Sequence, residues 1–524
     1  MISENATKTR KHLLASLACV AVLATATAAN AATYYVNGSS GSDSSSGASD
    51  KPLKTIGAGL RKLAAGDTLI VADGTYYDQA NFINDGLASI ASGTATAFTT
   101  IRAANPLGVR IRNTGSKDNE TDYYESPLRI RGTRIAVDGF IFDLRDQTGT
   151  PFVGEVEGSY NKVTRSIFRR QGGVDRYGGW MSVGGHHQLI EDVAGVGAAR
   201  YGFFSGGPTA DTHHIIYRRV VGRFDFSSSV EPKATFAGYG TDANWGVHHI
   251  LYQNCIALDG QRGPNTGDVH YGAWYFPKNL DAGQIVGSIA LNNSVAYSGM
   301  FVQELQGRNT LVSNSVSWAT IGGSGIRWNG MGSIGIDHVT VGGNTAEPAL
   351  TNYNNSVTAT LSQSVFAKIG SVVDGNGGLN LVNNAFDLSS LLKGTGSILA
   401  PTLRYLPDAS RDTGMSNMGA VILKRVGRSG TFYDDAGYNE VTSENLWPWP
   451  NEAMIKSVFA ETNTPKSGNT PSTNNTVRGF TVATDQFGKT MTLTRYIWQY
   501  LGNEIPTDIY SAKTPNPPTN LAAR

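Results

Sequence analysis

The chain has 524 residues, 62 of them glycine, and only 16% of its residues are charged. Its formal net charge is +1, and loss of segment 1–32 would leave 40 basic and 41 acidic side chains. A chain this close to neutral has no overall field that would recruit nucleic acid or an anionic membrane surface, so we expect neither as a partner.

Residues 1–32 have the layout of a secretory signal peptide. Three basic residues precede an apolar stretch at 13–26, and Ala29-Asn-Ala supplies the small residues of a cleavage site. No other segment approaches the length of a membrane span. We therefore predict a secreted protein, periplasmic or extracellular. The mature chain keeps one cysteine, Cys255, which lies in a strand-like run and is expected to be a small buried apolar residue.

Residues 53–64 are predicted to form an amphipathic helix, because Leu53, Ile56, Leu60 and Leu63 recur at helical spacing. A strand at 68–71 and an Asp-Gly turn are expected to follow. This helix–strand–turn segment resembles the N-terminal start of secreted right-handed parallel β-helix proteins, the pectate-lyase-like superfamily. The resemblance implies that the helix caps the first coil, whose strand edge and apolar interior would otherwise be open.

A short glycine phrase repeats through the middle of the chain. Its six copies begin at Gly179, Gly202, Gly238, Gly272, Gly299 and Gly325. Successive copies are therefore 23–36 residues apart, a period typical of solenoids. A second phrase, polar and then β-branched, follows each of the first five glycines after about ten residues, and two such markers indicate repeated units. Each unit is long enough for three short strands. We predict an all-β fold, a right-handed parallel β-helix, as one domain over residues 33–440.

The texture of the sequence changes from about residue 440. Segment 441–512 contains two helix-like aromatic runs around a polar loop, and we interpret it as a cap packed on the last coils. Residues 513–524 read as a proline-rich, linker-like tail.

Aligning the repeats on their glycines predicts an exposed line of aromatic side chains. Strand alternation places the second residue after each glycine on the outer surface, so Phe204, Trp274 and Phe301 would form a ribbon with Arg327 beyond them. Contiguous exposed aromatic rings suit the apolar faces of sugars. The alternative is that neighbouring loops fold over the rings and bury them.

Two long loops, at 223–245 and 259–281, are the strongest functional signal, because insertions on one face of a repeat array usually build its binding site. Together with the next two coils they carry the following acids, bases and cations: Arg223, Asp225, Lys233, Tyr239, Asp242, Asp259, Arg262, Asp268, His270, Tyr271, Lys278, Glu304 and Arg327. Ordinary solvated ion pairs are the alternative explanation for these charges.

Two reactions on a polysaccharide fit this composition. A lyase must neutralise a uronate carboxylate and remove the neighbouring proton. Arg327, Arg262 or Lys233 would neutralise it, and His270, Lys233 or Tyr271 would transfer protons, with Tyr239 nearby. A glycoside hydrolase instead needs two carboxyl groups, for which Asp242, Asp268 and Glu304 are available. Substrate would also contact Phe204, Trp274, Phe301, Arg262, Lys278 and Glu304.

We predict a lyase acting on an acidic polysaccharide. A non-catalytic carbohydrate-binding or surface-structural protein is the alternative from another class, and a hydrolase is the second alternative. No aspartate cluster points to Ca²⁺, so no cofactor is predicted, although a Ca²⁺ requirement stays open. The sequence does not indicate an oligomeric state.

Three histidine pairs recur at equivalent coil positions. The first members, His186, His213 and His248, are predicted to stack as a ladder, and the second members to point the other way. A metal site is not predicted here, because no nearby carboxylate completes a ligand set at suitable spacing.

Overall fold

The fold is described from a computed structural model. The chain divides into two compact units, Met1–Ala31 and Ala32–Arg524, and the described helices and strands all belong to the second. The structure describes residues 31–113, 126–144, 152–171, 178–206, 211–225, 233–238, 240, 246–261, 271–277, 280–295, 298–303, 307–329, 332–352, 359–375, 379–381, 386–387, 418–461, 476–485 and 487–499. Nearly all of the predicted signal peptide and the whole 513–524 tail lie outside these residues, and both stay predictions.

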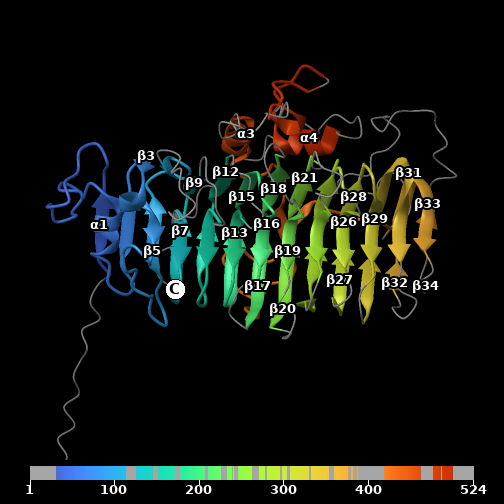
Figure 1. The fold of residues 1–524 in the computed structure, drawn as a ribbon, viewed down its shortest axis with the longest axis horizontal. Coiled ribbons are helices and arrows are strands. Elements are labelled where there is room, and N and C mark those ends of the chain that lie inside the picture. The colour runs from blue at the N-terminus through green and yellow to red at the C-terminus, as the bar shows by residue number, and fades with distance from the viewer. Residues whose placement is uncertain are drawn as a thin grey trace, which may run out of the picture. The chain divides into compact units, whose positions relative to one another are not determined.

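The second unit is a right-handed parallel β-helix, as predicted (Figure 1). One parallel sheet, the first ladder, collects a strand from each coil, and β23 (Leu280–Asp281) also pairs with it. Its order is β1 (Thr33–Val36), β2 (Thr68–Val71), β5 (Thr99–Ala103), β8 (Ile135–Asp138), β11 (Lys162–Thr164), β14 (His186–Glu191), β17 (Thr212–Arg218), β20 (Val247–Gln253), β24 (Gln284–Val286), β27 (Thr310–Ser313), β30 (Ile334–Asp337), β32 (Ala359–Ser362) and β34 (Leu379–Leu381).

Two further parallel ladders complete the coils. The second ladder runs through β3 (Gly74–Tyr77), β6 (Val109–Arg112), β9 (Phe140–Leu144), β12 (Ile167–Arg170), β15 (Ala194–Gly197), β18 (Val221–Phe224), β21 (Ile256–Leu258), β25 (Ile289–Leu291) and β28 (Val316–Trp318). The third runs through β4 (Ile83–Asn84), β7 (Leu128–Ile130), β10 (Gly154–Val156), β13 (Gly179–Val183), β16 (Tyr201–Ser205), β19 (Ala234–Gly238), β22 (Gly272–Phe276), β26 (Ser298–Gln303) and β29 (Ser324–Trp328).

The long strands β31 (Thr340–Asn352) and β33 (Val365–Gly375) join the second and third ladders into one sheet. β31 pairs with β28 near its start and with β29 near its end, so a single strand spans both faces. β35 (Phe386–Asp387) then pairs with β33.

Corner residues with a left-handed backbone turn the chain from the first ladder to the second. After β14, β17 and β20 these are Asp192, Arg219 and Asn254, with φ of 56°, 52° and 51°. This conformation costs about 1–2 kcal/mol for most L-residues and less for Asn and Asp, which explains the frequency of these two at coil corners.

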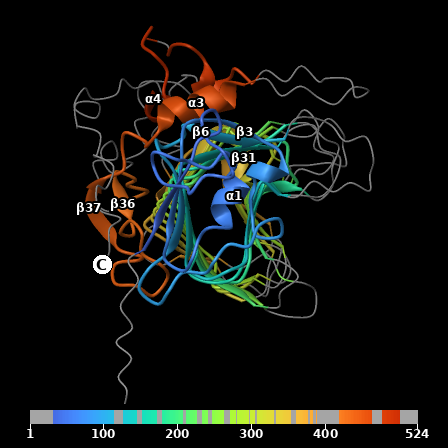
Figure 2. The same cartoon turned by 90° about the vertical axis from the view of Figure 1, so that its left-hand side faces the viewer.

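A short helix covers the first coil. α1 (Ile56–Leu60) lies within the predicted 53–64 segment and is shorter than predicted, and all five of its residues are buried. The Thr55 side chain accepts a hydrogen bond from the backbone of Ala58 and so caps the helix. Viewed from this end, α1 lies inside the outline of the coils, which confirms its capping role (Figure 2). A 3₁₀ turn, η1 (Gln79–Asn81), follows β3.

Residues 418–461, 476–485 and 487–499, which we call the C-terminal segment, lie along the side of the coils. The prediction that residues 441–512 pack on the last coils is therefore wrong, because Glu461 contacts Arg110 on an early coil and Phe459 contacts Arg223 on a middle coil. The segment contains β36 (Lys424–Val426), β37 (Val441–Asn445), α3 (Glu452–Ala460), η2 (Gly479–Thr481) and α4 (Leu493–Gln499) (Figures 1 and 2). Its contacts extend from Arg110, which donates to Glu461 at 2.9 Å, to Thr340, whose hydroxyl accepts from Ala420 at 2.9 Å.

Apolar side chains on the outer surface of the second ladder explain this placement. Ile167, Val221, Ile289 and Val316 form one buried cluster with residues of α3, α4 and the Trp447–Trp449 segment. Strands β15, β21 and β25 of this ladder are therefore buried on both faces, as their continuous runs of apolar residues and glycine require.

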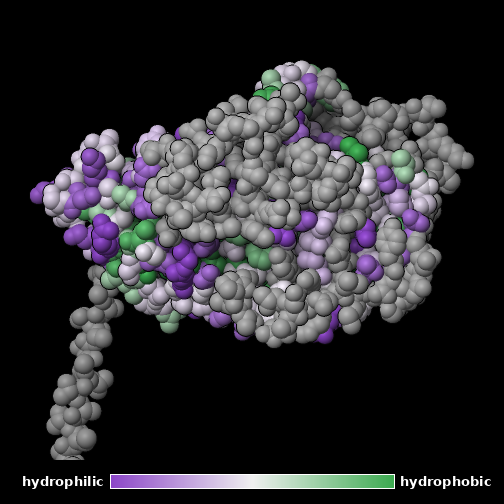
Figure 3. Space-filling view, viewed as in Figure 1, coloured by the Kyte–Doolittle hydropathy of each residue, from purple (hydrophilic) through white to green (hydrophobic). Residues whose placement is uncertain are grey.

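The interior of the coils is a continuous apolar stack. Cys255 belongs to it, fully buried, and burial raises the pKa of its thiol to about 12, so the predicted apolar role is confirmed. Among the described residues, no helix combines the length and apolar character needed to cross a membrane. On the face shown in Figure 3, hydrophobic side chains lie in small patches among hydrophilic ones.

Candidate functional site

Side chains at paired positions on successive strands of the third ladder form two columns, one that points into the core and one that points outward. The residues in both columns differ from those predicted by aligning the glycines. The inward column contains Met181, Phe203, Phe236 and Trp274, aligned by Cα pairing. Trp274 is fully buried, and its ring stacks on Phe236 at 4.8 Å. The prediction that Trp274 is exposed to substrate is therefore wrong. Phe301 pairs with Trp274 in register, so its position belongs to the column of Trp274 and not to that of Phe204.

The error arises because the glycine does not keep one position in the coil. Gly179 pairs with Tyr201 and not with Gly202, and Gly238 pairs with Ser205. A shift of one residue exchanges the two faces of a strand, so aligning glycines mixed inward with outward residues.

The outward column keeps two of the predicted residues. Its positions, in order along the coils, are Ser182, Phe204, Ala237, Tyr275, Val302 and Arg327. Phe204 and Arg327 are partly exposed. Tyr275 takes the place that was predicted for Trp274, two coils before Arg327, or about 10 Å at a strand spacing near 4.8 Å.

Aromatic rings gather on this outer surface and form a cluster separate from the core. Tyr201, Tyr271, Tyr275 and Phe204 belong to it. Phe204 stacks on Tyr201 at 5.3 Å, and Tyr271 meets Tyr275 edge-on at 5.0 Å. Tyr201 and Tyr275 are each 6% exposed, whereas Phe204 and Tyr271 are half-buried. The patch is therefore neither the fully exposed line of rings that was predicted nor the fully buried alternative, because two rings are covered and two remain accessible.

A row of polar side chains borders this aromatic patch. Arg200, Lys233 and Tyr271 each stand just before a third-ladder strand, and backbone hydrogen bonds of 2.7 and 2.8 Å link them coil to coil. The Lys233 ammonium donates to the Tyr271 hydroxyl at 3.0 Å and lies 4.2 Å from the centre of the same ring. The Arg200 guanidinium lies over the Tyr201 ring at 5.4 Å. We call Arg200, Lys233 and Tyr271 the polar row.

Sequence reasoning found Lys233 and Tyr271 but missed Arg200. What the three residues share is their place in the coil. Each directly precedes a strand of the third ladder, and the first residues of these strands, Tyr201, Ala234 and Gly272, are paired in register. In the sequence this shared place is hidden by loops of different length between the strands.

The other predicted site residues divide into two groups. Seven lie outside the described residues and stay predictions: Tyr239, Asp242, Arg262, Asp268, His270, Lys278 and Glu304. Three loop charges are structural. Arg223 pairs with Asp225 and donates to the Phe459 carbonyl at 2.6 Å, and Asp259 accepts from Tyr496 at 2.6 Å, so all three hold the C-terminal segment.

The histidines form two ladders on the first-ladder strands β14, β17 and β20. The predicted stack is confirmed: the rings of His186 and His213 lie 5.2 Å apart, and those of His213 and His248 lie 4.8 Å apart. The second members also stack, with 4.9 Å from His187 to His214 and again from His214 to His249, so the prediction that they point the other way is wrong.

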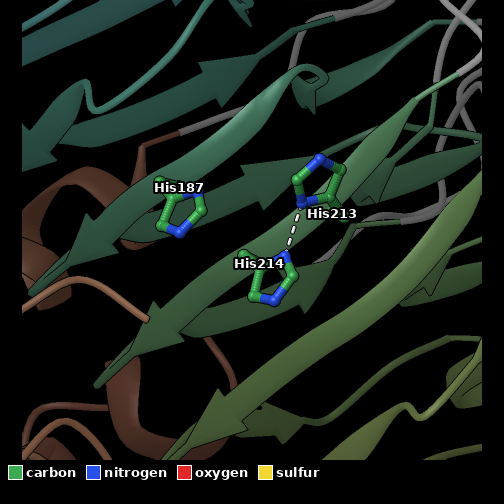
Figure 4. A group of neighbouring side chains, drawn as sticks. All are labelled: His187, His213 and His214. Carbon is green, nitrogen blue, oxygen red and sulfur yellow. Dashed lines mark hydrogen bonds between the residues drawn. The ribbon is translucent and has the colours of Figure 1, made fainter. Parts of the chain in front are cut away.

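A left-handed backbone at each second histidine explains this outcome. His187, His214 and His249 have φ of 51°, 55° and 54°, which breaks the alternation of the strand. The two rings of each pair therefore face each other through Nδ1, at 3.0 Å for His186–His187, 2.5 Å for His213–His214 and 2.7 Å for His248–His249. Figure 4 shows the His213–His214 pair with His187 beside it. We call each facing pair a rung.

Two carboxylates border the rungs, one directly before β17 and one from the C-terminal segment. Asp211 lies 3.6 Å from His213 Nε2. Asp434 lies 4.0 Å from His187 Nε2 and 3.7 Å from His214 Nε2. Burial, and then the neighbouring imidazoles, lower the pKa of His214 from 6.5 to about 4. Within the described parts of the chain, the ligand atoms of His187, His213 and His214 lie within 4.8 Å of one another, close enough to hold one metal ion.

Comparisons with known proteins concern the fold. No protein-family model matches the chain, and no curated protein matches its sequence. Among solved structures, the A-module of Azotobacter vinelandii mannuronan C-5 epimerase AlgE6 is 10% identical, with 61% of this chain and 91% of that chain covered and a TM-score of 0.38. Pectate lyase Pel9A is 13% identical over 79% of this chain and 96% of that chain, with a TM-score of 0.36. Alginate lyase AlyF-OU02 is 12% identical over 74% and 88%, with a TM-score of 0.36. At such low identity the likeness is one of fold and not of chemistry.

Proposed function

We propose that this protein is a secreted lyase that cleaves a uronate-containing polysaccharide by β-elimination. The observation that carries the proposal is the contact of 3.0 Å between the Lys233 ammonium and the Tyr271 hydroxyl, in a row that also contains Arg200. Two proton-transfer groups and a permanent cation stand beside partly exposed aromatic rings. These groups supply the cation, the base and the acid that β-elimination requires, and no carboxylate of the protein is needed.

The polar row supplies the groups that the reaction requires. Arg200 would pair with the substrate carboxylate and stabilise the negative charge that develops when the neighbouring proton leaves. Lys233 would act as the base that removes that proton, and the Tyr271 hydroxyl would protonate the departing glycosidic oxygen. Phe204 would support a neighbouring sugar ring, and Arg327, farther along the outward column, would bind a carboxylate of another residue of the polymer.

Substitution of the two proton-transfer groups tests the proposal. We expect Lys233→Gln and Tyr271→Phe each to lower the rate of formation of unsaturated uronates by about 10²–10⁴-fold, the usual contribution of a positioned acid or base. The assay follows ultraviolet absorbance on a panel of acidic polysaccharides. Matched controls are Lys54→Gln and Tyr77→Phe, because both residues are exposed and lie on early coils outside the polar row.

Three results would reject catalysis by this row. Equal rates for Lys233→Gln and Lys54→Gln would show that the reaction occurs elsewhere. If no polysaccharide gives a rise in ultraviolet absorbance but one of them still binds, the protein is a carbohydrate-binding protein and not a lyase. New reducing ends without unsaturated products would favour the hydrolase alternative, whose three carboxylates lie outside the described residues.

A further inference from the structure

The three rungs present nitrogen lone pairs in an unusual arrangement. In each rung two Nδ1 atoms face each other at 2.5–3.0 Å, and the second histidines of successive rungs stack at 4.9 Å along the solenoid. Between two neutral imidazoles this contact requires one ring to donate an Nδ1 proton and the other to accept it. A metal ion in place of that single proton would be bound by both nitrogens, and imidazole is among the commonest metal ligands in proteins.

The central rungs offer a third ligand. His187, on the coil before the His213–His214 rung, stacks on His214 at 4.9 Å, and one ligand atom from each of the three rings lies within 4.8 Å of the others (Figure 4). Their side chains are 16%, 18% and 21% exposed, so an ion can reach them from solvent.

The carboxylates stand where the outer shell of a metal site requires them. A metal-bound histidine usually donates its second ring N–H to a carboxylate, which fixes the tautomer and the ring orientation. Asp434 faces Nε2 of both His187 and His214, and Asp211 faces Nε2 of His213. Each of the three histidines therefore has a carboxylate beside its Nε2, opposite the Nδ1 that faces the other histidine of its own rung.

We propose that His187, His213 and His214 bind one divalent transition-metal ion of the Zn²⁺ type, with Asp434 and Asp211 as outer-shell partners. Nδ1 of His213 and His214 and a ring nitrogen of His187 are the ligands, and a water molecule completes a tetrahedron. Imidazole nitrogen favours Zn²⁺, Co²⁺, Ni²⁺ and Cu²⁺ over Ca²⁺ and Mg²⁺, so the site is distinct from a calcium site for a uronate.

The geometry requires a modest adjustment. At Zn–N distances of about 2.0–2.1 Å, two nitrogens of a tetrahedral site are about 3.3 Å apart. The His213–His214 pair at 2.5 Å must therefore open by about 0.8 Å. The His187 nitrogen, within 4.8 Å of the others, must approach by at most about 1.5 Å. All three rings are partly exposed, so rotation about their side-chain bonds can supply these movements.

The test uses the full-length mature protein without a histidine tag. Titration calorimetry with Zn²⁺ measures the number of ions and the affinity, and Co²⁺ reports the ligands through its visible absorption. We expect one site per chain, and a loss of at least 10-fold in affinity, with loss of the Co²⁺ absorption, in His214→Asn and His213→Asn. The Asp434→Asn variant should bind about 10–100-fold more weakly, the usual effect of removing an outer-shell partner.

A matched control separates the site from general effects of losing a histidine. His338 also has a left-handed backbone, with φ of 50°, and its ring contacts Asp337 away from the three rungs. Asn is tolerated in this conformation, as at Asn309, where φ is 52°. His338→Asn should bind Zn²⁺ like the wild type. No bound ion at millimolar Zn²⁺, or equal affinity in His214→Asn and His338→Asn while both remain folded by circular dichroism, would overturn the proposal.

Discussion

Acidification should destabilise the protein through its histidine ladders. His214 is the clearest case, because burial and the surrounding imidazoles lower its pKa from 6.5 to about 4 in the folded protein. The pKa values of His187, His213 and His248 are lowered as well, mainly by burial. Between pH 6.5 and 4 the unfolded chain therefore binds protons that the folded chain excludes. The penalty is absent above pH 6.5 and complete below about pH 4.

The size of the effect follows from the two pKa values. A pKa difference of about 2.5 corresponds to about 3 kcal/mol when both states are compared below pH 4. The His214 side chain is 21% exposed, and solvent screens part of this energy, so we expect about 2 kcal/mol from this histidine. The three other lowered values add to the loss in the same direction.

Urea unfolding at a series of pH values, in the presence of a metal chelator, measures this dependence. The informative quantity is the difference between wild type and His214→Asn, because carboxylates away from the histidine rungs titrate equally in both. By proton linkage we expect the wild type to lose about 2 kcal/mol more than His214→Asn between pH 7 and 4, whereas His338→Asn should follow the wild type. Parallel curves for wild type and His214→Asn would refute the assignment of a depressed pKa to His214.

Three further predictions concern stability and reactivity. Trp274→Ala should cost about 3–5 kcal/mol in urea unfolding, because it empties a fully buried site in the core, and a loss below about 1 kcal/mol would place the ring outside the core. Cys255 should react with a thiol reagent only after unfolding, since it is fully buried and its pKa is raised to about 12; rapid reaction of the native protein would contradict this. Arg223→Ala should remove one of the two guanidinium groups that pair with the buried Asp225, the other being Arg478, together with the hydrogen bond to the Phe459 carbonyl. We expect a loss of about 1–3 kcal/mol and exposure of the C-terminal segment to limited proteolysis; an unchanged digestion pattern would argue against that role.

The regular features of this fold were accessible from the sequence, because they recur with the coil. The glycine phrases indicated the solenoid, and the equivalent positions of His186, His213 and His248 predicted their stacking, which the structure confirms. The alternation of side chains along a β-strand then predicted which residues of each strand point into the core and which point outward. It failed for Trp274 because the glycine marker shifts within the coil, and for His214 because a left-handed residue within the strand keeps its ring on the same side as that of His213.

The remaining features depend on contacts that have no local signal. Glu461 meets Arg110 across 351 residues, so the sequence near either one does not indicate that the C-terminal segment lies beside the coils. Asp434 reaches the histidine rungs from a distant part of the chain, so the sequence near the histidines gave no sign of this carboxylate. Asp211, two residues before His213, was visible in the sequence but was not recognised as a partner of the histidines. Arg200 was missed because loops of unequal length separate it from Lys233 and Tyr271 in the sequence, although all three occupy one position of the coil.

The lateral position of the C-terminal segment changes how the solenoid should unfold. In a simple repeat array each coil contacts only its neighbours, so the array behaves as a one-dimensional chain that can fray from its ends. Here one continuous strap is bound to early coils through Arg110, to middle coils through Arg223 and to late coils through Thr340. Loss of any one coil then weakens the attachment of the strap to the others, and this coupling favours a single cooperative transition over stepwise fraying.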